Sequence, residues 1–417
     1  MTESIRRIGL SLGADLCWPV YYEDIVSELD LALDVGGETV RFDIERVTIE
    51  PFDLTQPVRY DLVMDRLSPW YPTTREWIKK AVVMDGLYVL NNPFTFQSMQ
   101  KHTSYVAMMR LGLPVPKTWM LPPRDYEEGP DLGITLDSYA RMFDLRDIGE
   151  KVGYPAFLKP YDGGAWVGVS RIDSYENLQA AYDSSGTRVM HLQEAVEPFD
   201  LFVRALGVGP QVNSMRYDPG APIHDRYKVD FEFLDADEWQ RMEDVALIIN
   251  GFFGWDFNSC EALRRNGILH PIDFANANPD SQVTSLHYHI PWLVKALIRW
   301  SLFCATTKRP MRIATDWEPY FEIADSGGSE TERIKDMAAI ARAGFDHLEF
   351  ASFCDTYLGE LDEVAWTYFG EDRAKAAVRH KVGAVFPAHE VDQFTEHFWG
   401  LLAFWRTTER DRLDALA

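Results

Sequence analysis

One segment of the sequence combines a lysine with a glycine-rich turn in a way that could hold phosphate groups. An apolar stretch after Gly153 ends in Lys159, and Gly163, Gly164 and Gly168 follow closely. Glycines allow backbone N–H groups to approach an anion, and the lysine adds a full positive charge beside them. The combination suits a triphosphate, although the Gly-Lys-Ser/Thr of a Walker A loop is absent. Taken alone, a simple glycine hairpin with a surface lysine is the commoner explanation.

A second segment, residues 190–200, is an apolar strand that runs into acidic residues. The backbone of such a hinge can read an adenine ring, and a carboxylate a few residues later can accept hydrogen bonds from both ribose hydroxyls. Acidic residues after a strand usually belong to a solvated loop, so this segment has weight only in combination with the others.

The third segment, residues 256–280, contains two carboxylates that could share a metal ion. Asn266-Gly267 is a strong signal for a two-residue hairpin turn, and Glu261 and Asp273 lie at nearly equal distances from it. The two carboxylates should therefore be near cross-strand neighbours that repel each other, so a cation is expected between them. Oxygen ligands without His or Cys favour Mg²⁺, and Asn276 can add a neutral oxygen. Carboxylates that simply face water are the alternative, but the apolar residues of the hairpin predict that it is largely buried.

In this order along the chain, the three segments resemble the ATP-grasp ligases. The resemblance extends upstream to Asn91-Asn92-Pro93, to Lys101 and to the run from Gly112 to Thr118, and it covers about residues 85–280. It implies the α/β (overall α+β) ATP-grasp fold, with an N-terminal α/β domain before it and an added C-terminal helical region after it. The common order and spacing of the motifs favour the resemblance over coincidence.

The resemblance implies a role for each matching residue. Lys101 and Lys159 match the two nucleotide-contacting lysines. Gly163, Gly164 and Gly168 match the loop that closes over the phosphates. Gln193, Glu194 and Val196 match the adenine hinge, and Asp200 matches the ribose acceptor. Glu261, Asp273 and Asn276 match the metal-binding set.

The sequence departs from the family pattern in two respects. The last motif is one residue longer than Glu-x-Asn-x-x-Pro, so Asn276 or Asn278 could be the amide ligand; we prefer Asn276, which keeps the three-residue spacing to Pro279. Four cations also stand where family members bind the triphosphate or a substrate carboxylate. They are Arg204, Arg216, Arg226 and Lys228. We expect Arg204 and Arg226 to be catalytic together with Lys159, but the sequence does not choose among the four, and surface charges are the alternative for each.

ATP-grasp enzymes phosphorylate a carboxylate with ATP and let an amine, or less often a thiol, attack the acyl phosphate. The resemblance therefore implies ATP, one or two Mg²⁺ ions with Mn²⁺ as an alternative, and small-molecule or peptide carboxylate and amine substrates. Three other hypotheses are an ATP-grasp enzyme with a thiol or phosphoryl acceptor, a non-catalytic nucleotide-binding scaffold, and an unrelated metal-dependent hydrolase. The intact lysines and carboxylates argue against the scaffold, and the scarcity of further ligands near Glu261 and Asp273 argues against the hydrolase.

Other polar residues could contribute to the substrate site. Asp15, Arg41 and Asp65-Arg66 follow strand candidates, where ligands bind in open α/β sheets. His287 and His289 alternate like strand residues, and a histidine there could take a proton from the attacking ammonium. The alternative is that these histidines only lead into an apolar helix from Pro291 to Phe303. Cys260 is expected to be a small buried hydrophobic residue rather than a nucleophile.

The chemistry must be positioned by several domains, because 417 residues exceed the length of one. Alternating strand and helix patterns near the N-terminus predict a small parallel sheet. We expect an α/β domain over 1–98, a small ATP-grasp subdomain over 99–190, a central domain over 191–300 and helices over 301–417. Phe394, Phe398, Leu401, Leu402 and Trp405 fall on one helical face, which predicts core packing.

Composition limits the classes of partner. With 41 Lys and Arg against 65 Asp and Glu, the net charge is −24, so neither nucleic acid nor a membrane surface is an expected partner. The 4 cysteines form no CxxC pair, and the N-terminus lacks the apolar core of a secretion signal, so we expect a cytoplasmic protein. A homodimer is compatible with the sequence, which does not determine the oligomeric state.

Overall fold

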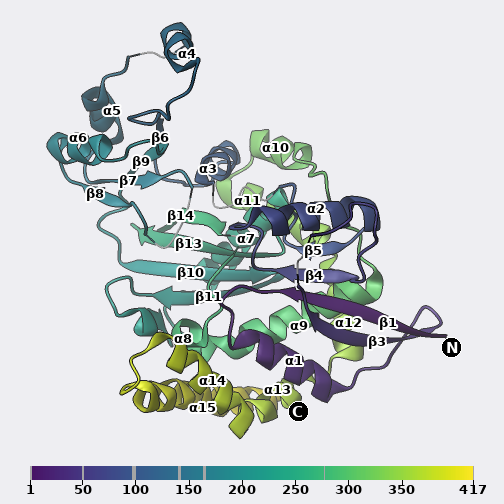
Figure 1. Ribbon diagram of the computed structural model, residues 1–417. Coiled ribbons are helices and arrows are strands. Elements are labelled where there is room, and N and C mark those ends of the chain that lie inside the picture. Colours follow the sequence, from purple (N-terminus) through teal and green to yellow (C-terminus); the bar gives the residue numbers. More distant parts are fainter. Residues whose placement is uncertain are drawn as a thin grey trace. The chain divides into compact units, whose positions relative to one another are not determined.

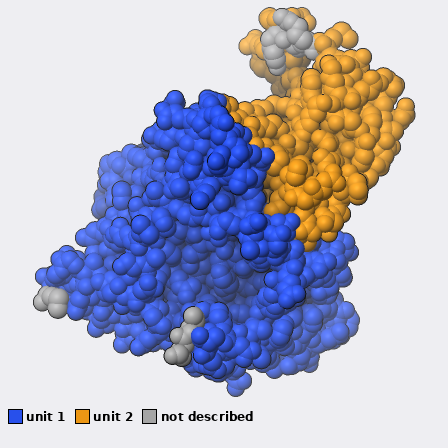
Figure 2. All heavy atoms as spheres, turned by 180° about the vertical axis from the view of Figure 1, so that it is seen from behind, with its two compact units in different colours: residues 1–96, 204–259, 277–417 blue, residues 97–203, 260–276 orange. Residues whose placement is uncertain are grey.

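The computed structural model describes residues 2–48, 51–95, 100–139, 142–162, 166–276 and 278–416. The chain forms two compact units whose segments interleave along the sequence (Figure 2). Unit 1 contains residues 1–96, 204–259 and 277–417, and unit 2 contains residues 97–203 and 260–276. Two of the four expected domains, 1–98 and 301–417, fall in unit 1, except for residues 97–98. The expected domain over 99–190 falls in unit 2, and the one over 191–300 is divided between the two units.

The N-terminal part of unit 1 is a five-stranded sheet with the order β2-β3-β1-β4-β5. Its strands are β1 (Thr2–Ser11), β2 (Leu33–Val35), β3 (Glu38–Arg46), β4 (Leu62–Asp65) and β5 (Tyr88–Leu90). All neighbouring pairs are parallel except β2 with β3, which confirms the predicted parallel sheet. Arg41 lies within β3 and pairs with Glu3 and Asp30, so its expected place after a strand was wrong.

Helix α9 (Ile290–Thr307) is the centre of the unit 1 core. It packs against β1, β4 and α1 (Trp18–Leu29) (Figure 1). Side chains all around it are buried. A helix that is apolar on nearly every face must be enclosed on all sides, as α9 is. The predicted helix over 291–303 is therefore confirmed. Helix α2 (Pro72–Asp85) lies between β4 and β5 in the chain.

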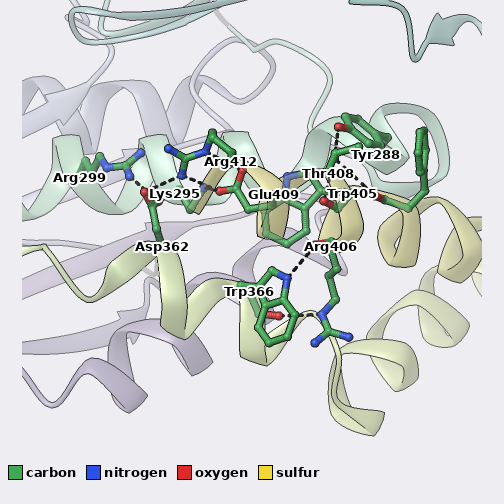
Figure 3. A network of polar contacts seen from close by, with 11 residues as sticks. Tyr288, Lys295, Arg299, Asp362, Trp366, Trp405, Arg406, Thr408, Glu409 and Arg412 are labelled. Carbon is green, nitrogen blue, oxygen red and sulfur yellow. Dashed lines mark hydrogen bonds and ion pairs between the residues drawn. The ribbon is translucent and has the colours of Figure 1, made fainter. Parts of the chain in front are cut away.

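The C-terminal region of unit 1 is helical, as the sequence predicted. The helices are α10 (Glu318–Asp325), α11 (Glu330–Gly344), α12 (His347–Tyr357), α13 (Leu361–Tyr368), α14 (Asp372–Val385) and α15 (Val391–Leu416). Phe398, Leu402 and Trp405 of α15 are buried on the predicted face. A polar network that includes Lys295 joins α9, α13 and α15 (Figure 3).

Unit 2 contains a four-stranded antiparallel sheet with the order β6-β9-β7-β8. Its strands are β6 (Thr118–Leu121), β7 (Ala156–Pro160), β8 (Ser170–Ile172) and β9 (Met190–Glu194). Its helices are α3 (Lys101–Arg110), α4 (Leu132–Tyr139), α5 (Leu145–Val152) and α6 (Tyr175–Asp183). Leu158 and Leu192 point to the face covered by α5 and α6, so Lys159, one residue on from Leu158, points to the other face.

The remaining strands form a sheet with the order β12-β11-β10-β13-β14. They are β10 (Leu201–Val208), β11 (Gln211–Tyr217), β12 (Tyr227–Lys228), β13 (Phe257–Arg265) and β14 (Ile268–Asn276). Between β13 and β14, Asn266 and Gly267 have φ values of 54° and 75°, as a type I′ hairpin turn requires. The predicted hairpin is thus confirmed, and with it the mixed α/β fold.

Unit 1 also contains helix α7 (Ala236–Phe253) and three short helices, which are η1 (Ile223–Asp225), α8 (Val283–Leu286) and η2 (His287–His289). Within the described ranges, every helix is too short or too polar to cross a membrane.

Candidate functional site

Lys159 at the end of β7 is a buried ammonium whose hydrogen-bond partners are neutral. Its Nζ donates to Gln193 Oε1 at 2.7 Å and to the Ile272 carbonyl oxygen at 3.2 Å, and lies 5.1 Å from the centroid of the Tyr105 ring. Only 9% of the residue is exposed. Burial lowers the pKa of Lys159 to about 8, and the nearby Asp273 carboxylate partly offsets this effect. A cation held in this way by neutral groups retains the capacity to neutralise a ligand's negative charge.

Lys101, the first residue of α3, forms an ion pair with one of the two predicted metal carboxylates. Its Nζ donates to both carboxylate oxygens of Asp273, at 2.9 and 3.0 Å. Asp273 and Glu261 both act electrostatically on Lys159 and Tyr105, which places the two carboxylates in one neighbourhood. The structure therefore brings both predicted lysines and both predicted carboxylates together within unit 2, with Lys101 paired to Asp273.

The donor set of this cluster fits Mg²⁺ only when a ligand completes it. In the described part of the chain, no group of three or more His, Cys, Asp or Glu side chains is arranged to hold a metal ion. Two carboxylates without nitrogen or sulfur donors match a Mg²⁺ site in which phosphate oxygens and water supply the other ligands. Asn276 ends the same strand as Asp273, but an odd separation puts the two on opposite faces of a regular strand. The carboxylates thus carry the metal hypothesis, and Asn276 stays a prediction.

The glycine loop is described only in part. Gly163 and Gly164 lie outside the described residues. Gly168 has a φ of +75°, and a Cβ there would lie 2.3 Å from Arg188 Nη1, so this position requires glycine. The flanking strands β7 and β8 form an antiparallel pair, and β8 begins at Ser170.

The predicted adenine and ribose residues lie at the end of β9 and just after it. Gln193 links Lys159 to Thr118, because its Nε2 donates to Thr118 Oγ1 at 2.8 Å. Glu194 pairs with Arg265 at 3.1 Å and Asp200 pairs with Arg264 at 2.9 Å, while Val196 is buried. Sequence reasoning missed these two arginines. Their signal was the consecutive Arg264-Arg265 pair just before the hairpin turn, whose side chains point to opposite faces of the strand.

The four cations named from the sequence all have partners inside unit 1. Arg204 donates to the Tyr227 hydroxyl at 2.8 Å and stacks on the Tyr217 ring, and Arg226 donates to the Ala221 carbonyl at 3.0 Å. Arg216 pairs with Asp230 and Lys228 pairs with Asp225, each at 2.7 Å. The catalytic roles expected for Arg204 and Arg226 stay predictions.

His287 and His289 form the 3₁₀ turn η2, so the predicted strand alternation was wrong. His287 Nδ1 accepts from the Tyr288 backbone N–H at 2.8 Å, and His289 Nε2 lies 3.2 Å from the Lys228 carbonyl oxygen. Burial lowers the pKa of His287 to about 3 and that of His289 to about 4. Groups with pKa values so far below neutrality are weak general bases, so the proton-acceptor hypothesis is not supported. Cys260 is buried, as expected, and burial raises the pKa of its thiol.

No protein-family model matches the chain. Two curated proteins are similar in sequence, and both are described as D-alanine–D-alanine ligases. The Streptomyces griseus protein is 26% identical over 170 residues, which are 38% of this chain and 41% of that protein. The Heliobacterium modesticaldum protein is 29% identical over 102 residues, which are 24% of this chain and 27% of that protein. The chain resembles the ATP-grasp ligases.

Solved structures also align with the chain at low sequence identity. A D-alanine–D-alanine ligase from Bacillus anthracis complexed with ATP is 13% identical, with 73% of this chain and 99% of that chain covered and a TM-score of 0.46. An ATP-grasp RimK domain protein from Sphaerobacter thermophilus is 13% identical, with 67% and 94% covered and a TM-score of 0.46. The matched sequence spans less than half the length of either curated relative.

Proposed function

We propose that this ATP-grasp-like protein is an ATP- and Mg²⁺-dependent ligase that joins a carboxylate to an amine and releases ADP and phosphate. The observation that carries the proposal is the cluster of Lys101, Lys159, Glu261 and Asp273 in unit 2. Two buried lysines and two carboxylates on adjacent elements are the set of charges that a metal–triphosphate complex needs. The similarity of parts of the sequence to D-alanine–D-alanine ligases supports the same class of reaction.

The cluster assigns a task to each side chain. Lys159 binds phosphate oxygens and keeps its Nζ oriented through Gln193. Lys101 exchanges its Asp273 partner for the triphosphate when the nucleotide binds, because Asp273 is then needed by the metal. Glu261 and Asp273 hold Mg²⁺, which would supply electrostatic stabilisation of the phosphate charge. All four groups are fixed by secondary structure, so little reorganisation is needed during the reaction.

The reaction has two steps, and neither needs a covalent bond to the protein. A substrate carboxylate oxygen attacks the γ-phosphorus of ATP, and the bond to the β–γ bridging oxygen breaks to release ADP. The amine nitrogen of the second substrate then attacks the acyl carbon, an amide forms, and inorganic phosphate leaves with its oxygen. One proton from the amine is released to solvent. Lys101 and Lys159 stabilise the charge that accumulates on the phosphates during the first step.

The test is ADP formation with Mg²⁺, ATP and pooled amino acids and small carboxylates. Wild-type protein should release ADP only when both a carboxylate and an amine are added. The conservative variants Glu261→Gln and Asp273→Asn should fold normally and lose activity by about 10³-fold, because each removes one carboxylate of the metal site. Asp173→Asn is the matched control, since Asp173 is an exposed acid of unit 2 that pairs with Arg171.

The possible products separate the proposal from its competitors. Turnover that needs a thiol instead of an amine would indicate the thioester-forming alternative. Thermal stabilisation by ATP without any turnover would favour the non-catalytic scaffold. Full activity in both carboxylate variants would contradict the assignment of the metal site.

A further inference from the structure

The loop that follows β4 in unit 1 holds two side chains in a rigid frame. Asp65 accepts hydrogen bonds from the Ser68 backbone N–H at 3.0 Å and from Ser11 Oγ at 3.0 Å. The Arg66 N–H donates to the Ser11 carbonyl at 2.8 Å, and the Ser68 carbonyl accepts from Arg75 Nε at 3.0 Å. Both ends of the loop are therefore fixed, and the directions of the Arg66 and Ser68 side chains are set before any ligand binds.

The Arg66 guanidinium is buried and uses only part of its hydrogen-bonding capacity. Its Nη2 donates to the Pro279 carbonyl at 2.9 Å and to Ser281 Oγ at 2.8 Å, and its Nε lies 3.5 Å from Asp15 Oδ2. Nη1 has no hydrogen-bond partner even though it is buried, and the whole residue is only 7% exposed. A buried N–H without an acceptor costs about 1–3 kcal/mol, and more for a charged group, so an acceptor is expected at this point.

Three further buried polar atoms around Arg66 also lack partners. They are Ser68 Oγ, Asn278 Oδ1 and Gln282 Oε1. The amide nitrogen of Asn278 donates to the Arg66 carbonyl at 3.3 Å, and that of Gln282 donates to Asp15 Oδ1 at 3.3 Å. Each amide is thus oriented by one end and leaves its oxygen unused. Four such atoms in one connected cluster indicate a site for a polar ligand rather than four separate packing defects.

We propose that Arg66, Ser68, Asn278 and Gln282 form a binding site for the carboxylate and the adjacent nitrogen of an amino-acid or peptide substrate. This inference rests on the proposed ligase function and identifies the residues that select its substrate. Arg66 Nη1 and the Ser68 hydroxyl are the donors that a carboxylate requires, and the guanidinium makes the bond charge-assisted. The oxygens of Asn278 and Gln282 are the acceptors that an ammonium or amide N–H requires.

Asp15 orients this site and does not bind the ligand itself. Its carboxylate already accepts from Trp18 Nε1 at 3.0 Å, from Ser281 Oγ at 3.2 Å, and from the Gln282 and Arg66 side chains. With these donors in place, Asp15 neutralises the Arg66 charge in the free protein and keeps the guanidinium in position.

The experiment measures binding separately from turnover. The probes are the L- and D-forms of the common amino acids, simple dipeptides, and the carboxamide of every compound that binds, each followed by ligand-observed NMR in the presence of Mg²⁺ and ATP. We expect at least one acid to bind wild-type protein and its carboxamide, which lacks the negative charge, to bind about 10-fold more weakly or worse.

Two variants test the named residues. Arg66→Lys keeps a positive charge but loses the planar donors, and it should weaken binding of the acid by about 10-fold or more. Ser68→Ala removes a hydroxyl that makes no hydrogen bond in the free protein, so the melting temperature should not change while the acid binds several-fold more weakly. Arg46→Gln and Ser352→Ala are the matched controls, because Arg46 is paired with Glu23 at the surface and Ser352 is exposed.

The outcomes distinguish this inference from the proposed function. Equal binding of acid and carboxamide, unchanged affinity in both Arg66→Lys and Ser68→Ala, or no binding of any probe at about 10 mM, where even a millimolar Kd would be detected, would overturn the site. Binding that depends on Arg66 and Ser68 without ADP formation would support the site and contradict the ligase. ADP formation that is unaffected by both variants would support the ligase and contradict the site.

Discussion

Two lysines are buried to a similar degree in the two units, but their surroundings differ. Lys295 in α9 is 5% exposed and forms ion pairs with Asp362 at 3.0 Å and with Glu409 (Figure 3). Lys159 in β7 is 9% exposed, and its direct partners are an amide oxygen and a backbone carbonyl. Both ammonium groups also lie near an aromatic ring, 5.4 Å from Trp405 and 5.1 Å from Tyr105.

The difference separates a structural charge from one that is kept for a ligand. Around Lys295 the protein supplies carboxylates, and these receive further bonds from Arg299 and Arg412. Burial opposes ionisation of Asp362, but Lys295 and Arg299 outweigh it and hold the pKa of Asp362 well below its usual range. Around Lys159 burial dominates and lowers the pKa of the lysine itself. A buried charge that the protein's own carboxylates neutralise stabilises the fold, whereas a buried charge without such a partner favours binding of a ligand of opposite charge.

The largest predicted effect is on stability, in Lys295→Met. This change removes the cation that Asp362 and Glu409 share. Because Arg299 and Arg412 still pair with these carboxylates, the loss should lie at the lower end of the about 3–5 kcal/mol that breaking a buried pair from one side costs. The measurement is the free energy of unfolding in urea. Lys375→Met is the control, because Lys375 pairs with Glu396 at the surface and such pairs contribute about 0–1 kcal/mol. Equal losses in both variants would remove the distinction between the two lysines.

Lys159→Met should have the opposite pattern. The variant removes the cost of burying the ammonium but leaves the Gln193 and Ile272 oxygens without their donor, so the stability should change little. ATP binding should weaken by about 2 kcal/mol because a charge-assisted bond to phosphate is lost. Calorimetric titration with Mg²⁺ and ATP gives the affinity, and thermal unfolding gives the stability. A destabilised variant that still binds ATP normally would place Lys159 in the same structural class as Lys295.

The sequence predicted the parts of the fold that depend on local patterns. Asn266-Gly267 determined the hairpin turn because few other residue pairs tolerate positive φ at both positions. The face of α15 followed from the spacing of Phe398, Leu402 and Trp405. The sequence did not predict that the chain leaves unit 2 and returns to it, since interleaved segments depend on contacts between residues far apart in the chain.

The candidate site was predictable in its residue types and less so in its pairings. Lys101, Lys159, Glu261 and Asp273 were identified and do lie together, but the ion pair of Lys101 with Asp273 depends on how α3 packs against β14. The histidines of η2 were misread because alternation over three residues also fits a 3₁₀ turn. Unpartnered buried atoms such as Arg66 Nη1 leave no pattern in the sequence.

Acidic pH should destabilise unit 1 because two buried histidines become protonated more readily in the unfolded chain. His287 and His289 have pKa values of about 3 and about 4 in the folded protein, both lowered mainly by burial, against about 6.5 when unfolded. Protonation therefore favours the unfolded chain, so stability is full above about pH 6.5 and falls as the pH decreases toward 4. At pH 5 the loss should be about 2 kcal/mol for each histidine and about 4 kcal/mol for the two together. Wild type and His289→Asn are compared by urea unfolding at pH 7 and pH 5, and identical pH dependence in both would contradict this origin.

The smallest predicted effect tests whether an exposed ion pair can also serve a ligand. Asp200 pairs with Arg264 at 2.9 Å but remains largely exposed, so Asp200→Asn should change the free energy of unfolding by less than about 0.5 kcal/mol. If Asp200 accepts hydrogen bonds from the ribose hydroxyls, the same change should weaken ATP binding by about 1 kcal/mol. The 2′,3′-dideoxy analogue of ATP lacks both hydroxyls and should bind wild type and variant equally. A variant that loses affinity for both nucleotides to the same extent would exclude the ribose contact, and the Asp200–Arg264 pair would then belong with Lys375–Glu396 as a surface ion pair.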